Sequence, residues 1–270
     1  MSHNHDGHMF GSSDHADSAG QPWEGREFEA NPFASDDGTT PEQLKLALDT
    51  FHALPLDSEE RAGRHMNVVD AIRVSRFLVP LLAEAGDVGV NAAGLVVDKT
   101  QELAIVTVAG PNGQKVLPVF TSVEAMQKWK PEARPVPVEA RRAALAAAAD
   151  GAQWIVVDPQ SSTEIVLRRP TVEAIAKGTP WVPNQIDPML QQVFGESITD
   201  EPFVKAIRLT SGDPDARGFD EELVVQVVLP PSLEQNEVER VIRSLSNKWA
   251  QQSIFSERVD SMRLQLVPAV

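Results

Sequence analysis

Apolar positions between residues 41 and 180 recur at strand and helix spacings, which predicts a domain built from both. Residues 116–120 form a run of branched and aromatic side chains that only Pro118 interrupts. Because proline has no N–H to donate to a neighbouring strand, this run predicts an edge strand or a bulged strand. A helix should follow at once, because Thr121 or Ser122 can cap it and Glu124 completes a capping box with Thr121.

Further helices and strands are predicted on both sides of this unit. Residues 109–113 read Ala-Gly-Pro-Asn-Gly, a strong turn signal, so strand 116–120 should return antiparallel to strand 103–108. Strands and helices do not alternate strictly, which favours an α+β arrangement over a doubly wound nucleotide-binding fold. The expected order is helix 41–55, helix 68–75, strand 76–82, strand 103–108, strand 116–120, helix 121–129, helix 138–149, strand 154–158, strand 164–167 and helix 171–177.

A second and smaller module follows a breaker-rich stretch that contains Trp181. Residues 203–209 alternate apolar and polar side chains with period two, as a half-buried strand does. Residues 223–229 form the next strand, and Ser232 can cap a long helix. Residues 262–266 alternate again, so the module should be a three-stranded ββαβ sheet covered by one helix. The apolar face of that helix consists of Leu233, Val238, Val241, Ile242, Leu245 and Trp249.

These patterns predict four parts along the chain. Residues 1–40 are a polar, acidic leader with too little apolar content to build a core, so disorder is expected there. Residues 41–180 form the first α+β domain, 181–200 a linker and 201–270 the second domain. The fold class is therefore α+β, with a mixed sheet and covering helices followed by a smaller ββαβ domain.

The charge of the chain argues against nucleic-acid binding. The formal net charge is −15, and residues 1–66 hold 13 Asp and Glu against 4 Lys and Arg. The remaining residues hold 26 acidic against 20 basic side chains, with basic residues in pairs at most. A phosphate backbone needs clustered Lys and Arg, so we expect no nucleic-acid partner.

Composition also restricts the compartment and the chemistry. The chain has no cysteine, which excludes a disulfide framework, a thiolate nucleophile and a cysteine-rich zinc site. No apolar run reaches the roughly 18 residues that a membrane span needs, and residues 1–20 lack the features of a signal peptide. We therefore expect a cytoplasmic protein without membrane association.

Histidines are the first candidates for chemistry. His3, His5 and His8 are weak metal candidates, but a polar tail offers no supporting residues around them, so no metal site is predicted. His52 and His65 have no carboxylate or nucleophile at an obvious spacing. Because no glycine-rich phosphate loop follows a predicted strand, we expect neither catalytic residues nor a cofactor.

Aromatic residues are the candidates for partner binding. Trp23, Phe28 and Phe33 could form a short docking segment in the leader, or they could be incidental aromatics in a linker. Trp181 lies between Pro180 and Pro183, where it could clamp the two domains or present a surface to a partner.

Five further residues are expected to have structural roles. Trp129, Trp154 and Trp249 should anchor the cores, because tryptophan buries a large apolar area. Asp158 and Asp260 should end strands by turn chemistry.

Together, two motifs carry a family resemblance. Residues 117–122 read Leu-Pro-Val-Phe-Thr-Ser and are followed by a helix ending in Trp129, a proline-rich connection and the Val-Val-Asp-Pro strand at 156–159. This combination resembles the N-terminal domain of the SseB family, named for enhanced serine sensitivity, over roughly residues 68–178. The ββαβ order, with Val259-Asp260 before the last strand, is similar to the SseB C-terminal domain.

Two functions are compatible with these observations. The sequence favours a non-enzymatic cytoplasmic regulatory or protein-interaction protein of the SseB type, because no linear pattern supplies a nucleophile with a base, a metal cluster or a phosphate loop. Its partner would be a protein of unknown identity, bound along an edge strand. The alternative is an enzyme or small-molecule sensor in serine or related amino-acid metabolism, with a site between the two domains.

Overall fold

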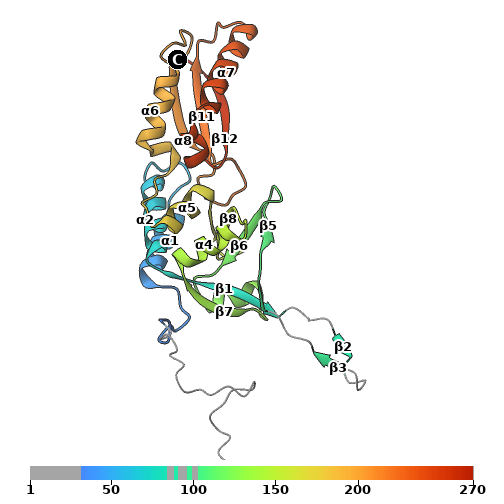
Figure 1. Ribbon diagram of the computed structural model, residues 1–270. Coiled ribbons are helices and arrows are strands. Elements are labelled where there is room, and N and C mark those ends of the chain that lie inside the picture. The colour runs from blue at the N-terminus through green and yellow to red at the C-terminus, as the bar shows by residue number, and fades with distance from the viewer. Residues whose placement is uncertain (1–31, 84–87, 91–95, 99–102, 270) are drawn as a thin grey trace, which may run out of the picture. The chain divides into compact units, whose positions relative to one another are not determined.

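The computed structural model describes residues 32–83, 88–90, 96–98 and 103–269 (Figure 1). The chain divides into two compact units, Met1–Asp36 and Asp37–Val270. In the described part of the first unit, the N–H of Asp36 donates to the carbonyl of Phe33 at 3.0 Å and closes a turn. Every helix and strand given below belongs to the second unit.

Two sheets joined by one bridge form the centre of the region before residue 180. In the first sheet β1 (Arg76–Ala83) lies between β4 and β7, and in the second the order is β5-β6-β8-β9. The bridge joins Leu78 and Phe120, whose backbones exchange hydrogen bonds of 2.8 and 2.9 Å. The strands are β4 (Leu103–Ile105), β5 (Val108–Ala109), β6 (Lys115–Val119), β7 (Arg134–Glu139), β8 (Trp154–Val157) and β9 (Ile165–Leu167), with a separate pair β2 (Val88–Val90) and β3 (Val96–Asp98).

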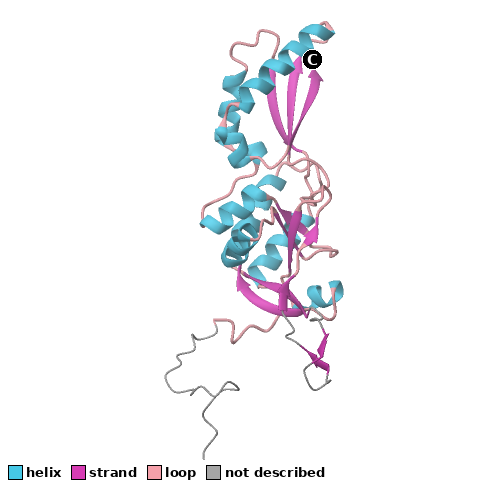
Figure 2. Ribbon diagram, turned by 45° about the vertical axis from the view of Figure 1, so that its right-hand side comes forward, coloured by secondary structure: helices cyan, strands magenta, loops and turns pink. Residues whose placement is uncertain are grey.

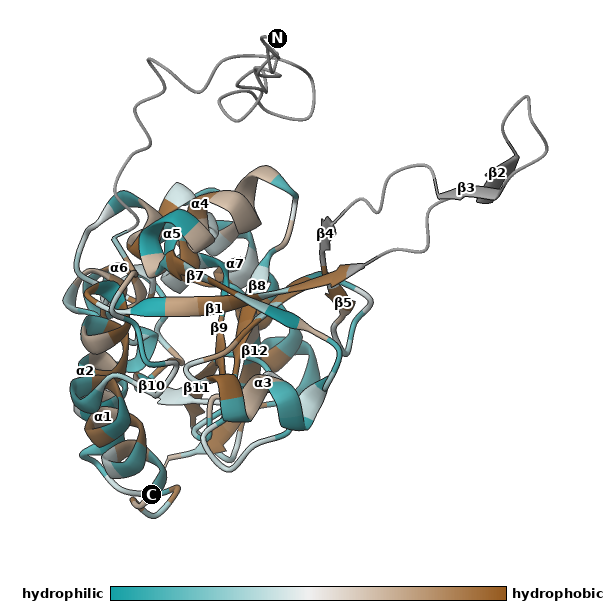
Figure 3. Cartoon of the chain, turned by 90° about the horizontal axis from the view of Figure 1, so that it is seen from below, coloured by the Kyte–Doolittle hydropathy of each residue, from teal (hydrophilic) through white to brown (hydrophobic). Residues whose placement is uncertain are grey.

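Helices cover these sheets and close the first core. The strands carry mostly hydrophobic colouring, whereas the helices alternate hydrophobic and hydrophilic positions (Figure 3). One cluster of buried side chains unites the inner faces of four helices with β1, β6, β8 and β9, and α3 packs instead on a smaller cluster around Phe120. The helices are α1 (Glu42–His52), α2 (Arg61–Arg73), α3 (Val123–Trp129), α4 (Ala140–Ala149) and α5 (Arg169–Lys177).

Strand β6 is not an edge strand, which is one of the two alternatives that the sequence predicts. It lies between β5 and β8, and it pairs with β8 in parallel through the register Pro118↔Val156. The backbone of Val119 faces β8, because its carbonyl accepts the N–H of Asp158 at 2.9 Å. Successive residues of a strand face opposite neighbours, so Pro118 faces the other side. On that side β5 pairs only with Lys115 and Val116, and the bridge to Leu78 forms at Phe120. No strand of the described part lies opposite Pro118 there, so its missing N–H leaves no hydrogen bond of the ladder unmade.

The predicted hairpin is only partly present. The turn at residues 109–113 does connect antiparallel strands, but β5 contributes only the pairs Val108↔Val116 and Ala109↔Lys115. Residues 103–105 pair with β1 instead. The error arises because adjacency in the sequence favoured one long hairpin, whereas the long β1 offered a second antiparallel partner.

A second core lies beyond residue 180. Its sheet has the order β10-β11-β12, antiparallel between β10 and β11 and parallel between β11 and β12. The residues of β11 that face the helices, such as Val225 and Val227, are fully buried against Leu245 and Trp249 of α7. Figure 2 shows the helices of this part beside its three strands. The elements are η1 (Asn184–Ile186), α6 (Pro188–Ser197), β10 (Ala206–Ser211), β11 (Leu223–Leu229), α7 (Gln235–Ala250), α8 (Ser253–Arg258) and β12 (Met262–Pro268).

The predicted α+β class and the ββαβ order are confirmed, with α8 as an additional helix. Helix α7 begins after Glu234 instead of Ser232, and Glu237 reaches back to the N–H of Glu234 at 3.2 Å. The domain boundaries at 180 and 200 stay a prediction, although Leu190 and Phe194 of α6 pack in the second core. None of the helices in the described part combines the length and the apolar character that crossing a bilayer requires.

The two sequence motifs meet at a buried carboxylate. Ser122 caps α3 by accepting the N–H of Ala125, so Thr121 is free for another role and the predicted capping box is absent. The N–H and the hydroxyl of Thr121 each donate to Asp158 at 2.7 Å. Asp158 is 2% exposed and has a φ of 48°, a left-handed conformation that aspartate adopts at modest cost. Asp158 therefore connects the end of β6 to the end of β8. This role goes further than the local turn that the sequence predicts for it.

Removing the hydroxyl of Thr121 should destabilise the chain. Burial raises the pKa of Asp158, and the hydrogen bonds from Thr121 oppose that shift by favouring the charged form. We expect Thr121→Val to lower the free energy of unfolding by about 1–3 kcal/mol in urea titrations, because a buried acceptor loses its donor. Thr121→Ser keeps the hydroxyl and should lie much closer to the parent, and equal stability of all three chains would show that the contact is unimportant.

Candidate functional site

The loop between β10 and β11, residues 212–222, brings the second core onto the first. Ala216 at its centre is 4% exposed and belongs to the first core. Its carbonyl accepts the N–H of Val166 in β9 at 2.7 Å, which extends the sheet edge by one contact. Ala216 has a φ of 52°, a conformation that is uncommon outside glycine and that the surrounding contacts must hold in place. We call this segment the β10–β11 loop.

A buried guanidinium organises the contacts around this loop. Arg168, immediately before α5, has a side chain that is 6% exposed and donates to Asp213 at 2.7 Å and to Asp260 at 3.4 Å. It also donates to Ser261 Oγ at 3.2 Å and to the carbonyl of Asp220. Its charged carbon lies 4.9 Å from the centre of the Trp154 ring, and the indole N–H of Trp154 donates to Asp260 at 3.1 Å. Arg168 thus donates hydrogen bonds to both loops, the one before β11 and the one before β12.

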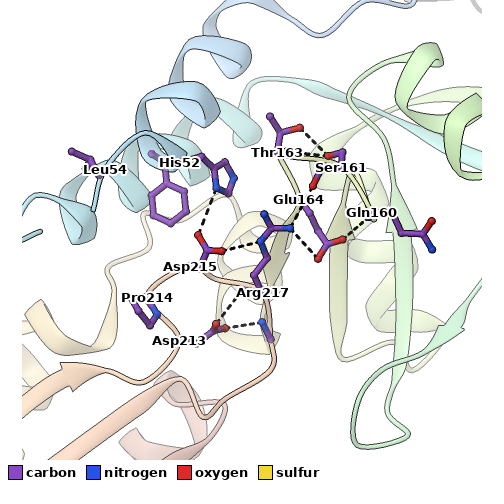
Figure 4. A network of polar contacts seen from close by, with 12 residues as sticks. His52, Leu54, Gln160, Ser161, Thr163, Glu164, Asp213, Pro214, Asp215 and Arg217 are labelled. Atoms are coloured by element: carbon purple, nitrogen blue, oxygen red, sulfur yellow. Dashed lines mark hydrogen bonds and ion pairs between the residues drawn. The ribbon is translucent and has the colours of Figure 1, made fainter. Parts of the chain in front are cut away.

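A second network of polar contacts involves the same β10–β11 loop (Figure 4). Asp215 accepts from Arg61 Nη2 and from Arg217 Nε, both at 3.1 Å, and lies 3.8 Å from His52 Nδ1. Arg217 continues to Glu164 at 3.4 Å. The network therefore alternates between acidic and basic side chains. They come from α1, α2, the segment before β9 and the β10–β11 loop.

The two histidines near this network are poor bases. Burial and then the charge of Arg217 lower the pKa of His52, while Asp215 raises it. Burial lowers the pKa of His65 to about 3, so its ring is neutral at physiological pH. The ring of His65 lies between Phe51 and Trp181, with ring centres 5.2 and 4.8 Å away. Aromatic packing is the role that these contacts define for it.

A small cavity lies beneath the loop, next to Arg168. Its volume is about 30 Å³, and Asn184, Asp213 and Glu222 are among the residues that line it. A space of this size holds a water molecule but not an amino acid. Burial and the nearby carboxylate of Asp260 raise the pKa of Glu222 to about 7, against the opposing effect of Arg168.

A much larger groove lies beside the last strand. It has a volume of about 670 Å³ and is open to solvent between α7, α8 and β12. Apolar side chains dominate its lining and include Trp249, Phe255, Met262 and Leu264. Met262 is 38% exposed and Leu266, further along β12, is 44% exposed.

Comparison with known families gives one match. Residues 44–174 match the family model of the SseB protein N-terminal domain. The chain contains the N-terminal domain of the SseB family. The matched region begins in α1 and ends in α5, so it starts earlier than the resemblance at 68–178 suggests. It contains Thr121, Asp158 and Arg168, whereas the C-terminal likeness to SseB proteins stays a prediction. Searches of curated proteins and of solved structures found no match.

The predicted site residues of this SseB protein fall in different places. His3, His5, His8, Trp23 and Phe28 lie outside the described residues. Within the described residues, no group of three or more His, Asp or Glu side chains is arranged to hold a metal ion.

The two predicted aromatic contacts that the structure describes differ in exposure. Phe33 is half-buried in the unit Met1–Asp36. Trp181 is only 8% exposed and packs in the first core, an arrangement closer to a clamp than to a free surface. Partner binding by either residue stays a prediction.

Two of the three tryptophans that were expected to anchor the cores are buried. Trp154 and Trp249 are buried at 6% and 5% exposure. Trp129 is only half-buried and packs on Phe120 with ring centres 5.3 Å apart. Asp260, expected to act in a turn, instead accepts hydrogen bonds from Trp154 and Arg168.

Sequence reasoning missed the charged residues of the junction. Asp213 and Asp215 lie in the connection after the strand predicted at residues 203–209, and Arg168 is one half of a basic pair, so no local spacing pattern pointed to the junction. The signal in the sequence was the density of acids in a single hairpin connection, because a solvated turn needs one or two of them. These acids are Asp213, Asp215, Asp220, Glu221 and Glu222.

Glycine is required at one position of the β10–β11 loop. Gly218 has a φ of +75°, and a Cβ there would lie 2.9 Å from Trp154. Gly151 has a φ of +74° but no heavy atom within 4 Å of such a Cβ. We expect Gly151→Ala to cost about 1–2 kcal/mol from backbone strain alone. Gly218→Ala should cost about 1–3 kcal/mol more in urea titrations, because Trp154 must also move.

Equal losses in the two variants would contradict close packing of the loop against Trp154. A loss confined to Gly151→Ala would contradict the loop conformation itself.

Proposed function

We propose that this SseB protein is a non-enzymatic regulatory protein that binds an extended segment of a partner protein along the outer edge of β12. The observation that supports this proposal most strongly is the position of an apolar groove directly beside an unpaired strand edge. In the described part of the chain, β11 is the one strand that pairs with β12.

The backbone groups available to a partner follow from the register. The N–H of Leu223 donates to the carbonyl of Ser261, and the N–H of Ala269 donates to the carbonyl of Leu229. Odd-numbered residues of β12 therefore face β11, and even-numbered residues face outward. Met262, Leu264 and Leu266 thus present N–H and C=O groups to a strand that adds at this edge.

The side chains of the same three residues lie on the helix face of the sheet, where Met262 and Leu264 line the groove. Leu264 is the register partner of Val225, which packs under α7, so Leu264 lies on the helix face of the sheet. Met262 and Leu266 lie two residues away on that face. An added strand would place alternate side chains over the groove, so the expected partner segment is extended and has apolar residues at every second position.

The alternative function is a small-molecule sensor or enzyme in amino-acid metabolism, with a site at the junction of the two cores. Its support is the convergence of Arg168, Asp213, Asn184 and Glu222 around a cavity. The volume of about 30 Å³ would have to increase before serine could enter. Stabilisation of the chain by millimolar L-serine in a thermal-shift assay would favour this alternative.

Charged residues at the β12 edge should weaken partner binding. The bait is the full chain, immobilised in native lysate, with Met262→Lys/Leu266→Lys as the edge variant and Leu46→Lys as the control. Leu46 lies on α1, far along the chain, and is 68% exposed. A partner that binds the parent and the control should bind the edge variant at least about tenfold more weakly, which corresponds to 1.4 kcal/mol.

Hydrogen exchange then tests the mode of binding with the purified partner. Partner binding should slow exchange of the outward amides of Leu264 and Leu266, whereas the amide of Gln265 already faces β11. Equal binding by all three baits, or protection elsewhere without protection of β12, would refute the proposal. Concentration-dependent pairing of the chain with itself through β12 would identify a second copy as the occupant.

A further inference from the structure

Negative charge exceeds positive charge at the junction of the two cores. The carboxylates of Asp213 and Asp260 pair with the single guanidinium of Arg168, and the carboxylate of Glu222 lines the same cavity and lies within the electrostatic influence of Arg168. The side chains of Asp213 and Asp260 are 8% and 11% exposed, so water screens them poorly. One guanidinium can balance only part of this charge.

Neighbouring cations are held by other partners. Arg217 pairs with Asp215 and Glu164, and Arg258 pairs with Asp187 at 2.6 Å. Arg169 pairs with Glu173 at 3.0 Å, and its Nη2 donates to the carbonyl of Val259. None of these contacts places a second basic side chain beside Glu222, so they leave the excess negative charge there in place.

The groups around Glu222 come from every element that packs on it. The N–H of Asp260, before β12, donates to Glu222 Oε2 at 2.8 Å, and Ser261 Oγ accepts the N–H of Glu222 at 3.0 Å. Arg168 contributes the opposing charge from the start of α5. The remaining neighbours are Asp213 from the β10–β11 loop, Asn184 from η1 and His65 from α2, which all line the same cavity.

The cavity contains polar atoms that lack partners. Asn184 is 2% exposed and lines this space; its Nδ2 completes no hydrogen bond of good geometry within the described residues, although the Asn184 side chain acts on Glu222 as a donor that lowers the pKa of that carboxyl. The Nε2 of His65 is buried and equally unpaired among the described residues. The Asn184 amide can donate to a carboxyl oxygen of Glu222 or to a water beside it, so the site can hold either form of that carboxyl group.

We propose that Glu222 is a proton-binding site that removes the surplus charge at the junction and makes docking of the β10–β11 loop stronger in mildly acidic than in alkaline solution. Protonation leaves Asp213 and Asp260 on Arg168 and converts Glu222 into a neutral hydrogen-bonding group. The proposal is independent of partner binding at β12.

The direction of the effect follows from proton linkage. Burial raises the pKa of Glu222 to about 7 in the folded chain from its ordinary value of 4.5. Between these values the folded state binds a proton that the unfolded state releases, so the stability from this group falls as pH rises and is lost above about 7. His52 acts in the opposite direction, because its pKa is lowered. A comparison of variants is therefore needed to isolate Glu222.

The decisive comparison uses Glu222→Gln and its neighbour Glu221→Gln in the full chain. Both changes remove one negative charge, but the side chain of Glu221 is 44% exposed and lies 3.7 Å from Arg263. Relative to the parent, Glu222→Gln should reduce the unfolding equilibrium constant at both pH values, and the reduction should be larger at pH 8 than at pH 5.5 by a factor on the order of ten or more, because the folded parent loses its proton between them. Glu221→Gln should show the same offset from the parent at both pH values.

A carboxyl carbon NMR titration of the parent provides the direct measurement and does not depend on the folding of a variant. The resonance of Glu222 should titrate with a midpoint near 7. A midpoint near 4.5, or a Glu222→Gln offset that follows that of Glu221→Gln across the pH range, would overturn the proposal.

Discussion

The arrangement of the two cores depends on the burial of Arg168. A guanidinium cannot lose its protons, so its removal from water is tolerated only where anions and acceptors replace the solvent. Here the replacements come from the second core, through Asp213 on one loop and Asp260 on another. Trp154 contributes both a ring face to Arg168 and an N–H to Asp260. A buried ion pair of this kind adds little net stability but penalises every arrangement that leaves one partner alone. It specifies how the loops dock.

The SseB domain itself is organised around a different carboxylate. Asp158 accepts both polar hydrogens of Thr121, and Thr121 in turn contacts Thr40 at 2.8 Å. Arg76 extends this group by donating to the carbonyls of Thr121 and Thr39. The two motifs by which the family resemblance could be seen are therefore the two halves of one buried polar contact. Their presence in the sequence has a structural reason, and catalysis is not needed to explain them.

Local pattern predicted the elements better than their partners. The face of α7, the strand at residues 154–157 and the turn at 109–113 depend on neighbouring residues, and the structure has all three. The prediction of an edge strand at Pro118 was wrong, because an inner strand accepts proline where no neighbouring strand needs its N–H. That depends on the residues with which β5 and β1 pair. The junction could not be foreseen, since Arg168 meets acids 45 and 92 residues away. No linear spacing encodes such pairs, and the density of acids in one loop was the available hint.

The two proposals assign different tasks to neighbouring parts of the second core. The β12 edge offers backbone groups beside an apolar groove, a combination suited to an extended peptide. The loop end faces the SseB domain and contains a water-sized cavity among acidic, basic and amide side chains. Because Glu222 immediately precedes β11 and Val225 of β11 lines the groove, the two proposed sites share one sheet. Each can nevertheless be tested without the other.

A double-mutant cycle between Arg168→Met and Asp213→Asn, measured as free energies of unfolding in urea, tests the central claim most directly. If this ion pair specifies the docking of the two cores, the coupling energy should be about 2 kcal/mol or more, as for other close and poorly solvated charge pairs. Losses that add to within about 0.5 kcal/mol would mean that the residues act independently and would contradict the account.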